Sequence, residues 1–286
     1  MSKRSAEPNI QLPGLVDPHD LSTDRQFAMN LARGLMVLRA FTASAPLLGN
    51  RELSDRTGLP KPTISRLTYT LALMGYLDRD KVTQKYRLGP GILSFAYPYL
   101  AGMPVRHLAR PLMERLAYRT GCNVNLGVRD RGDVVYIDGV RADRADLYRP
   151  DVGGVSPLLS SASGRALILG SGAGEQTAIL NFLRVRDRSV FERFSPVFEE
   201  DRKRFKSEGY CLSVGDWKPN LHAVAVPVYV PDGGPLLAMN CTLSSVSSPR
   251  DTLEKKVMPL LKETVTSLAE ALHKQSLPPL PLPPEL

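Results

Sequence analysis

Residues 50–88 constrain the fold of this chain more than any other stretch of its sequence. Residues 51–57 have the composition of a short helix, and a Gly-Leu-Pro run at 58–60 separates it from a second helical stretch at 61–74. A basic loop at 78–85 then lies between two short stretches that are typical of strands. This order predicts a winged helix-turn-helix, a module whose second helix fits the DNA major groove.

The second predicted helix has two chemically different faces. Ile64, Leu67, Leu71 and Met74 recur at helical spacing and form an apolar face. The opposite face carries side chains that suit DNA, because Arg reads guanine edges, hydroxyls bind phosphates or bases, and Tyr packs on the backbone. The predicted DNA contacts of this helix are Lys61, Thr63, Ser65, Arg66 and Tyr69.

The loop between the two predicted strands adds cations beside this helix. Arg79, Lys81 and Lys85 alternate with polar residues there, and we expect them to hold the flanking phosphates. An amphipathic stretch upstream predicts a third helix that completes the core of the module. Its predicted apolar face consists of Leu31, Leu35, Leu38 and Phe41.

Composition and charge agree with a polyanionic partner. The 286 residues allow two domains, and 43% hydrophobic with 23% charged residues is an ordinary globular composition. The net charge is +8, and residues 25–90 hold 11 Lys and Arg against 4 Asp and Glu.

The three cysteines lie far apart, which fits a reducing compartment. With no apolar run of about 20 residues and no signal-peptide pattern, we expect a cytoplasmic protein without a membrane partner.

The sequence divides into five predicted segments. Residues 91–103 contain Pro98, which we expect to kink or break a linker helix. Residues 104–275 mix predicted strands and helices without strict alternation, which favours an α+β domain with a largely antiparallel sheet. The five segments are a disordered arm (1–24), the winged helix-turn-helix (25–90), the linker helix (91–103), this second domain (104–275) and a proline-rich tail (276–286).

The predicted architecture of the second domain rests on the helices and strands that its residue patterns indicate. Helices are expected at 105–120, 160–169, 197–206 and 253–272, and strands at 122–129, 134–137, 210–214, 223–230 and 236–243. Residues 130–133 are expected to form a hairpin turn.

Several segments occur in an order and spacing that are typical of one regulator family. They are residues 31–38, 52–67, 75–77, 86–89, 157–167 (Pro-Leu-Leu-Ser-Ser-Ala-Ser-Gly-Arg-Ala-Leu), 209–210 and 223–228. On these residues the chain resembles the IclR family of bacterial transcription regulators, from about residue 27 to 275. The resemblance implies a GAF-like effector-binding domain after the winged helix-turn-helix, and a homodimer or homotetramer on a palindromic operator of double-stranded DNA. It also implies a small-molecule effector, often a carboxylate from carbon or aromatic catabolism.

The resemblance also implies where an effector would bind. The implied effector residues are Ala162, Ser163, Val214, Leu221, Ala223, Asn240 and Thr242. Their hydroxyls and amide can donate hydrogen bonds to a small acid, and a helix beginning near residues 161–164 favours an anion. An equally open alternative is that residues 161–164 are small only for packing.

Three positions depart from the family pattern and leave the effector's identity open. Leu159, Asp216 and Asn220 stand where the family often has His, Glu and Gly. Trp217 is the only tryptophan, and His222 is near it in the sequence. Trp217 either forms one wall of a pocket for an aromatic or bulkier ligand or only fills the space between the surface and the core.

The residues leave two other functions to consider for this chain, an enzyme and a DNA-binding protein without a ligand. An enzyme is disfavoured, because the four histidines stand alone, no Cys-x-x-Cys or His-x-x-x-His motif occurs, and neither a metal nor a cofactor site is expected. The glycine-rich run at 170–174 lacks the Lys-Ser/Thr of a phosphate loop and is expected to be a helix end and turn. The remaining alternative is a DNA-binding protein whose C-terminal domain only oligomerises and binds no ligand.

Overall fold

The computed structural model describes residues 14–16, 18–21, 23–142, 151–244 and 252–276. Its contacts divide the chain into two compact units, one from Val16 to Met103 and the other from Pro104 onward together with Leu15. Residues 1–13 of the predicted arm and 277–286 of the predicted tail lie outside the described residues. Within the predicted arm, Pro18–Leu21 forms η1, a short 3-10 helix, so the expectation of an arm without regular structure does not hold there.

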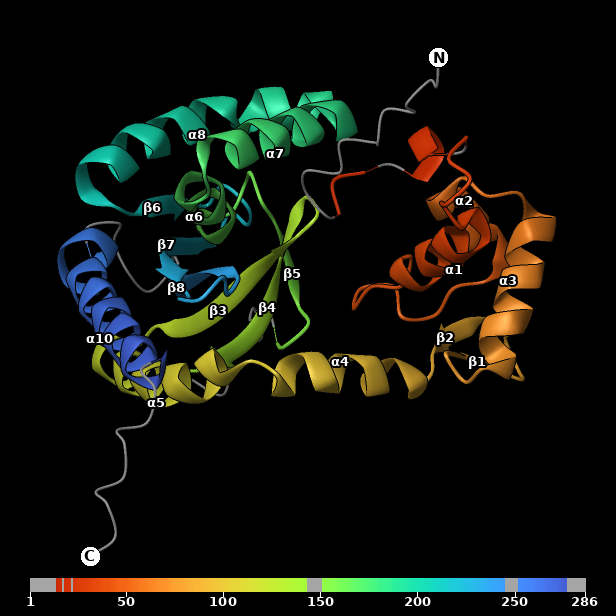
Figure 1. The fold of residues 1–286 in the computed structure, drawn as a ribbon, viewed down its shortest axis with the longest axis horizontal. Helices are drawn as coiled ribbons and strands as arrows, with labels where there is room; N and C mark the ends of the chain where they lie inside the picture. Colours follow the sequence, from red (N-terminus) through yellow and green to blue (C-terminus); the bar gives the residue numbers. More distant parts are fainter. Residues whose placement is uncertain (1–13, 17, 22, 143–150, 245–251, 277–286) are drawn as a thin grey trace, which may run out of the picture. The chain divides into compact units, whose positions relative to one another are not determined.

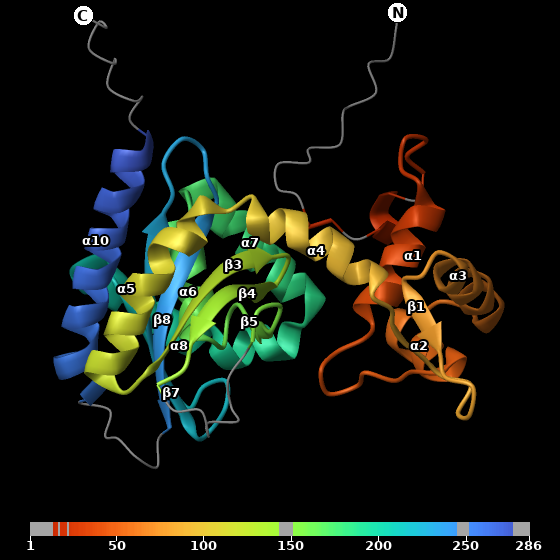
Figure 2. The ribbon, with the colours of Figure 1, turned by 90° about the horizontal axis from the view of Figure 1, so that it is seen from below.

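The first unit is a winged helix-turn-helix followed by one further helix (Figures 1 and 2). The antiparallel strands β1 and β2 form the wing, and the bridge Leu48↔Tyr86 extends it by one backbone pair. The elements are α1 (Met29–Arg39), α2 (Asn50–Thr57), α3 (Lys61–Leu73), β1 (Leu77–Arg79), β2 (Tyr86–Leu88) and α4 (Gly91–Ala101).

The turn between α2 and α3 follows directly from its residues. The helix α2 starts after Gly49, whose N–H donates to Glu52 Oε2 at 2.5 Å. It ends at Gly58, where φ is +71°, a left-handed conformation that glycine adopts without strain. Helix α3 begins after Pro60, whose ring removes no helical hydrogen bond at that position.

The core of this unit uses different helix faces from those predicted. Val37 and Phe41 of the α1 segment are buried with Leu53 and Ile64, whereas Leu31 and Leu35 are 65% and 52% exposed. The predicted face of α1 is therefore wrong at these two leucines. Apolar side chains recur at helical spacing on both sides of α1, and periodicity does not say which side meets the core.

The apolar face predicted for α3 is also wrong at its end. Met74 is 60% exposed, while Thr68 is fully buried and its hydroxyl donates to the Ile64 carbonyl at 2.9 Å. This local bond pairs the hydroxyl, so that a threonine takes a core position that hydropathy assigns to an apolar residue.

Helix α4 continues through the proline that was expected to kink or break it. Pro98 lies inside α4, and Gly102 N–H donates to its carbonyl at 2.9 Å. The expected break does not occur, because a proline removes only its own donor and the hydrogen bonds resume after it.

The second unit has three layers around one antiparallel sheet of order β5-β4-β3-β8-β7-β6. Helices α6, α7 and α8 cover one face, and α5 and α10 cover the other (Figures 1 and 2). The predicted α+β class and antiparallel sheet are confirmed. The strands are β3 (Asn123–Asp130), β4 (Asp133–Val140), β5 (Val155–Pro157), β6 (Cys211–Val214), β7 (Leu221–Tyr229) and β8 (Leu236–Ser244).

The helices of this unit extend beyond the predicted ones. They are α5 (Pro104–Thr120), α6 (Ala162–Gly170), α7 (Ala173–Arg186), α8 (Arg188–Glu208), the π-helical turn η2 (Leu253–Val257) and α10 (Met258–Ser276). The sequence patterns missed α7 and the first half of α8. Helix α7 has little buried surface, with Ile179 its one fully buried residue among those described, so no apolar period marks it.

The sheet presents chemically different residues to its two faces. The register places Asn125 opposite Asn240, and Asn240 opposite Ala225. Ala225 packs in the cluster that includes α6, so the two asparagines face the same helix. Val124 and Leu126 alternate with Asn125 and are fully buried on the other face.

Helix α6 approaches its neighbours closely because its first turn lacks large side chains. A Cβ on Gly164 would lie 2.1 Å from the Leu158 carbonyl oxygen, so no larger residue fits without a shift of backbone. The small residues of this segment thus serve packing, and they also bring the helix start against the polar side chains of the sheet.

Candidate functional site

The residues predicted to contact DNA lie on the side of α3 away from its core face. Lys61, Ser65, Arg66 and Tyr69 are exposed, and Tyr69 is 66% exposed. Thr63 is half-buried. This face offers one guanidinium, one ammonium, hydroxyls and an aromatic ring, a set that can contact phosphates and base edges.

The wing is shaped by Asp80, whose carboxylate accepts hydrogen bonds from the N–H of Val82 and from the N–H and hydroxyl of Thr83, at 3.1, 2.7 and 2.8 Å. These bonds lower the pKa of the Asp80 carboxyl and fix the loop tip that exposes Lys81. The guanidinium of Arg79 lies 5.8 Å from the centre of the Tyr86 ring.

Lys85 is placed differently from the other two wing cations. Its Nζ lies 2.5 Å from Glu52 Oε1, and its side chain is 38% exposed. The hydrogen bond from Lys85, followed by that from Gly49 N–H, lowers the pKa of the Glu52 carboxyl. The ammonium of Lys85 is therefore shared with the helix cap of α2, while Arg79 and Lys81 remain open to a phosphate.

A second polar site lies between the start of α6 and the sheet; we call it the α6 cavity. Six of the seven residues that the family resemblance implied as effector contacts line it. Val214 does not, and its side chain points outward with 39% exposure. The lining residues are Asn125, Tyr136, Ser161, Ala162, Ser163, Ser213, Trp217, Leu221, Ala223, Asn240 and Thr242.

The sequence analysis did not single out three of these residues, which are Asn125, Tyr136 and Ser213, and it named Ser161 only as part of the helix start at residues 161–164. One pattern in the sequence marks the first of them. Asn123 and Asn125 alternate with apolar residues in a strand that is otherwise core-like, so one face of a buried strand is polar. Buried amides need partners, and that need points to a polar site.

Hydrogen bonds connect the two sides of the α6 cavity. Asn125 Nδ2 donates to Asn240 Oδ1 at 2.9 Å, and Asn240 Nδ2 donates to Ser163 Oγ at 2.7 Å. Asn240 Nδ2 also lies 3.5 Å from the Tyr136 hydroxyl. Burial raises the pKa of Tyr136, so this hydroxyl keeps its proton at neutral pH.

The start of α6 is capped inside the same site. Ser161 Oγ accepts from Gly164 N–H at 3.0 Å and donates to the Pro157 carbonyl at 2.7 Å. Ser156 Oγ lies 3.1 Å from the Tyr136 hydroxyl and 3.4 Å from Ser161 Oγ. The hydroxyls therefore form one connected chain from the helix cap to the amides of the sheet.

The α6 cavity is small and its lining is uncharged. Its volume is about 20 Å³, room for roughly one water molecule. No Asp, Glu, Lys, Arg or His belongs to its lining in the described part of the chain. A larger ligand enters only when a wall moves.

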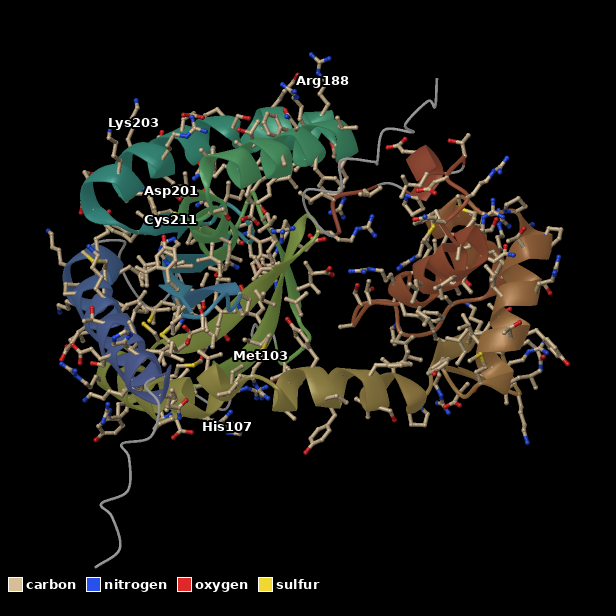
Figure 3. All side chains as sticks on the ribbon, viewed as in Figure 1. Met103, His107, Arg188, Asp201, Lys203 and Cys211 are labelled. Carbon is tan, nitrogen blue, oxygen red and sulfur yellow. The ribbon has the colours of Figure 1, made fainter. Side chains whose placement is uncertain are left out.

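Arg165, one turn into α6, joins this helix to α8, to β6 and to the loop after β6. It is fully buried; its Nε lies 2.5 Å from Asp201 Oδ2, and its NH2 group lies 2.9 Å from Asp216 Oδ2. It also donates to the carbonyls of Leu159 and Leu212, at 3.0 and 2.7 Å. Figure 3 shows Asp201 on α8 beside the start of β6. This cluster fixes the loop that carries Trp217.

The potential metal ligands and the buried thiols of the described residues were compared with the sequence predictions. They contain no group of three or more His, Cys, Asp or Glu that could hold a metal ion. Burial raises the pKa of the Cys211 and Cys241 thiols well above their usual value, which keeps them protonated. His107 lies on the exposed surface of α5 (Figure 3). Nor do these residues include a helix long and apolar enough to cross a membrane.

A winged helix-turn-helix with a basic exposed face, joined to a sheet domain with an internal polar site, defines a two-domain DNA-binding protein. Comparison with known proteins narrows this class. Residues 97–272 match the model of the bacterial transcriptional regulator IclR C-terminal domain, and residues 30–81 match the IclR helix-turn-helix domain. The chain belongs to the IclR family and is a DNA-binding transcriptional regulator. This membership also confirms that it is not an enzyme.

Individual relatives extend over nearly the whole chain. The HTH-type transcriptional regulator TsaQ1/TsaQ2 of Comamonas testosteroni is 28% identical over 258 residues, 90% of this chain and 92% of that protein. The crystal structure of an IclR family transcriptional regulator from Brucella abortus has a TM-score of 0.79 and 39% identity, covering 87% of this chain and 94% of that one.

One structural neighbour was solved with a ligand. It is an IclR homolog from Microbacterium hydrocarbonoxydans complexed with 4-hydroxybenzoate, with a TM-score of 0.62 and 22% identity. It covers 86% of this chain and 99% of that chain. At this identity the likeness shows the shared fold.

Proposed function

We propose that a small molecule with a carboxylate group binds in the α6 cavity and modulates operator binding by the winged helix-turn-helix. The observation that carries this proposal is the convergence of six residues, implied from separated segments, on one buried polar site. The family homolog with bound 4-hydroxybenzoate supports the same ligand class.

The chemistry of the site suits one carboxylate. Hydroxyls of Ser163 and Thr242 and the amide of Asn240 are donors, and the start of α6 adds backbone N–H groups and a favourable dipole. Binding of a larger acid requires a wall of the cavity to move, because the cavity as it stands holds about one water.

For the DNA side, we propose that α3 enters the major groove and the wing holds phosphates. The groove-facing residues would be Lys61, Thr63, Ser65, Arg66 and Tyr69, with Arg79 and Lys81 on the flanking phosphates. Lys85 contributes less, since it already pairs with Glu52. Such binding takes place where the chromosome lies, in the cytoplasm.

We further propose that the regulator binds a palindromic operator as a homodimer or a higher homo-oligomer. Helix α4 contains no charged residue and buries none of its side chains within the chain, and Leu93, Phe95 and Tyr97 are 70%, 63% and 73% exposed. Phe95 also borders a groove of about 640 Å³, which is lined by apolar side chains such as Leu31, Leu35 and Met74 and by the polar side chains of Asn30, Arg33, Thr63, Arg66 and Thr70. The exposed apolar side chains of α4 favour a protein partner, and a second copy of the chain would match the two-fold symmetry of the proposed palindromic operator.

The proposed dimer surface is tested by light scattering of Phe95→Ser, with Tyr118→Ser as the control. Tyr118 is 93% exposed and lies on α5, outside the groove. We expect Phe95→Ser to shift the protein towards smaller species while Tyr118→Ser leaves the mass unchanged. Equal masses for both variants would contradict this surface.

The effector proposal is tested by fluorescence anisotropy with DNA from upstream of its own and neighbouring genes. The titration is repeated across salt concentrations and with a panel of aromatic and short-chain carboxylates. We expect saturable binding that resists competitor DNA and changes with one acid. The emission of Trp217, the only tryptophan, reports in the same samples whether that acid enters the α6 cavity.

Two other results have a defined meaning. Specific operator binding that no acid alters, with unchanged Trp217 emission, supports the alternative in which the C-terminal domain only oligomerises. Weak, salt-sensitive binding to every DNA sequence would contradict the proposed reading of α3.

A further inference from the structure

A bulge in strand β4 places two neighbouring side chains on opposite faces of the sheet. In β4, Tyr136 lies opposite Gly127 of β3. Asp138 lies opposite Leu126, so Ile137 is an extra residue without a partner on β3. Such a bulge cancels the alternation that would otherwise put residues 136 and 138 on one face. Tyr136 therefore lines the α6 cavity, whereas Asp138 lies on the opposite face, which α5 covers.

Asp138 holds the first turns of α5 through two arginines. Its Oδ1 accepts a hydrogen bond from Arg110 Nη1 at 2.8 Å, and its Oδ2 lies 3.8 Å from Arg106 Nε. Gly139 N–H also donates to Asp138 Oδ1, at 2.8 Å. Asp138 is 3% exposed, so these donors take the place of water around its carboxylate. Residues 102–103 alone separate α5 from α4, the last helix of the winged helix-turn-helix unit.

The burial of Asp138 decides how firmly the start of α5 is tied to β4. Parting Asp138 from Arg110 would leave a buried carboxylate with less counter-charge, which costs free energy. At the other end of α5, Arg119 Nη1 lies 3.5 Å from Glu263 Oε2, and both side chains are more than half exposed. Water replaces that partner at little cost. A displacement of β4 is therefore carried to the start of α5, whereas the exposed pair at its end can open.

The α6 cavity is the place where such a displacement would begin. Its volume holds about one water, so a larger ligand moves a wall. Tyr136 is one of the walls, and its hydroxyl lies 3.1 Å from Ser156 Oγ of β5 and 3.5 Å from Asn240 Nδ2 of β8. A polar ligand that competes for these bonds acts on the residue beside the bulge, where a strand bends and its twist changes.

From this geometry we infer that Asp138 is a positioning residue that transmits occupancy of the α6 cavity to α5, and through α5 to the DNA-binding unit. A ligand that displaces Tyr136 changes the twist of β4 at the bulge. Asp138 then moves on the other face of the sheet and takes Arg106 and Arg110 with it. This inference rests on the proposed effector site and adds to it the route by which that site acts on operator binding.

The test compares two arginines of α5 in the full-length protein. Arg110→Gln removes the pair with Asp138, and the control, Arg119→Gln, removes the pair with Glu263; the two arginines are 52% and 53% exposed. With 4-hydroxybenzoate, benzoate and acetate as probes, Trp217 emission measures acid binding and anisotropy measures operator affinity. We expect Arg110→Gln to keep the acid affinity within about twofold, while the ratio of operator affinities with and without acid falls towards about one. Arg119→Gln keeps the wild-type ratio.

A second variant removes the carboxylate itself. Asp138→Asn takes away the charge that both arginines meet, at almost unchanged size, and we expect the ratio to fall as far or further. Its control is Asp133→Asn on the same strand, which removes a pair with Arg186 of α7 and should keep the ratio. If Asp138 had only a structural role, its loss would lower the melting temperature and weaken binding, but the ratio would survive.

Each other outcome decides the inference separately from the effector proposal. If the acids change operator affinity by the same ratio in Asp138→Asn and Arg110→Gln as in the wild type, this inference is wrong and the effector proposal stands. If no acid changes operator affinity, the effector proposal fails, and a cycle without ligand decides the inference.

That cycle combines Tyr136→Phe, which removes the cavity hydroxyl, with Arg110→Gln. Transmission through Asp138 predicts that Tyr136→Phe changes operator affinity in the wild-type background and has no further effect once Arg110 is replaced. The inference is overturned if the two single effects multiply to within about twofold in the double variant, or if Tyr136→Phe has no effect at all.

Discussion

Globular proteins usually bury apolar side chains and expose polar ones, and the two units of this regulator depart from this rule in opposite ways. The winged helix-turn-helix unit leaves Leu31, Leu35 and Phe95 more than half exposed. The C-terminal unit instead buries Asn125, and Arg165 is entirely enclosed. Exposed apolar side chains gain free energy when another macromolecule covers them, whereas buried polar groups need partners of matched geometry. The first unit thus presents surfaces for large partners, and the second a site for a small polar one.

We expect the largest effect on stability from removing the buried guanidinium of Arg165 in the C-terminal unit. Arg165→Met removes the cation that pairs with both Asp201 and Asp216 and leaves the buried Asp201 carboxylate with Arg204 alone. We expect a loss of about 3 kcal/mol in the free energy of unfolding. Chemical denaturation measures it. The control is Arg188→Met, which removes a guanidinium that is 83% exposed and pairs with Glu192. We expect a change under about 1 kcal/mol there. Similar losses in both variants would mean that the Arg165 cluster is not structural.

In the winged helix-turn-helix unit, Arg66→Ala tests whether Arg66 recognises a base of the operator. If Arg66 reads a guanine edge, we expect operator affinity to fall by about 1–3 kcal/mol, with a smaller change for DNA of scrambled sequence. Anisotropy titrations on both DNAs measure the difference. If the variant binds its operator as tightly as the wild type, the assigned face of α3 is wrong.

A smaller effect distinguishes the two wing lysines. Lys81→Ala should weaken binding to all sequences and flatten the slope of log affinity against log salt by about one. Lys85→Ala should change this slope less, because Glu52 already neutralises its charge. Titrations over a range of salt give both slopes. A larger effect from Lys85 would show that the Glu52 pair opens on DNA.

The smallest expected effect is the pH dependence of that pair. Hydrogen bonds from Lys85 and Gly49 lower the pKa of Glu52 in the folded protein. The pair therefore stabilises the fold above the ordinary Glu range and loses this contribution as the pH falls through the lowered pKa. We expect the melting temperatures of wild type and Glu52→Gln to differ near neutral pH and to converge below about pH 4. A constant difference at all pH values would exclude the ion pair as its source.

Local sequence rules were sufficient for the helix-turn-helix. Gly58 and Pro60 fix the turn through their own backbone preferences, and in the second unit the alternation of Val124, Leu126 and Val128 predicts a strand. These features depend on neighbours in sequence, so they were predicted from residues alone. The choice of core face on α1 was not predicted, since Leu35 and Val37 are equally apolar and only the packing of α2 and α3 selects between them.

Residue patterns were enough to predict the two-domain order and the class of fold, and the family resemblance that they carry implied six of the residues around the α6 cavity. Tertiary structure alone decided that Asn125 lines that cavity, that Lys85 pairs with Glu52, and that Val214 points outward. The physical reason is distance along the chain. Asn125 and Asn240 lie 115 residues apart and meet only because β3 and β8 pair in one register, which no local preference encodes.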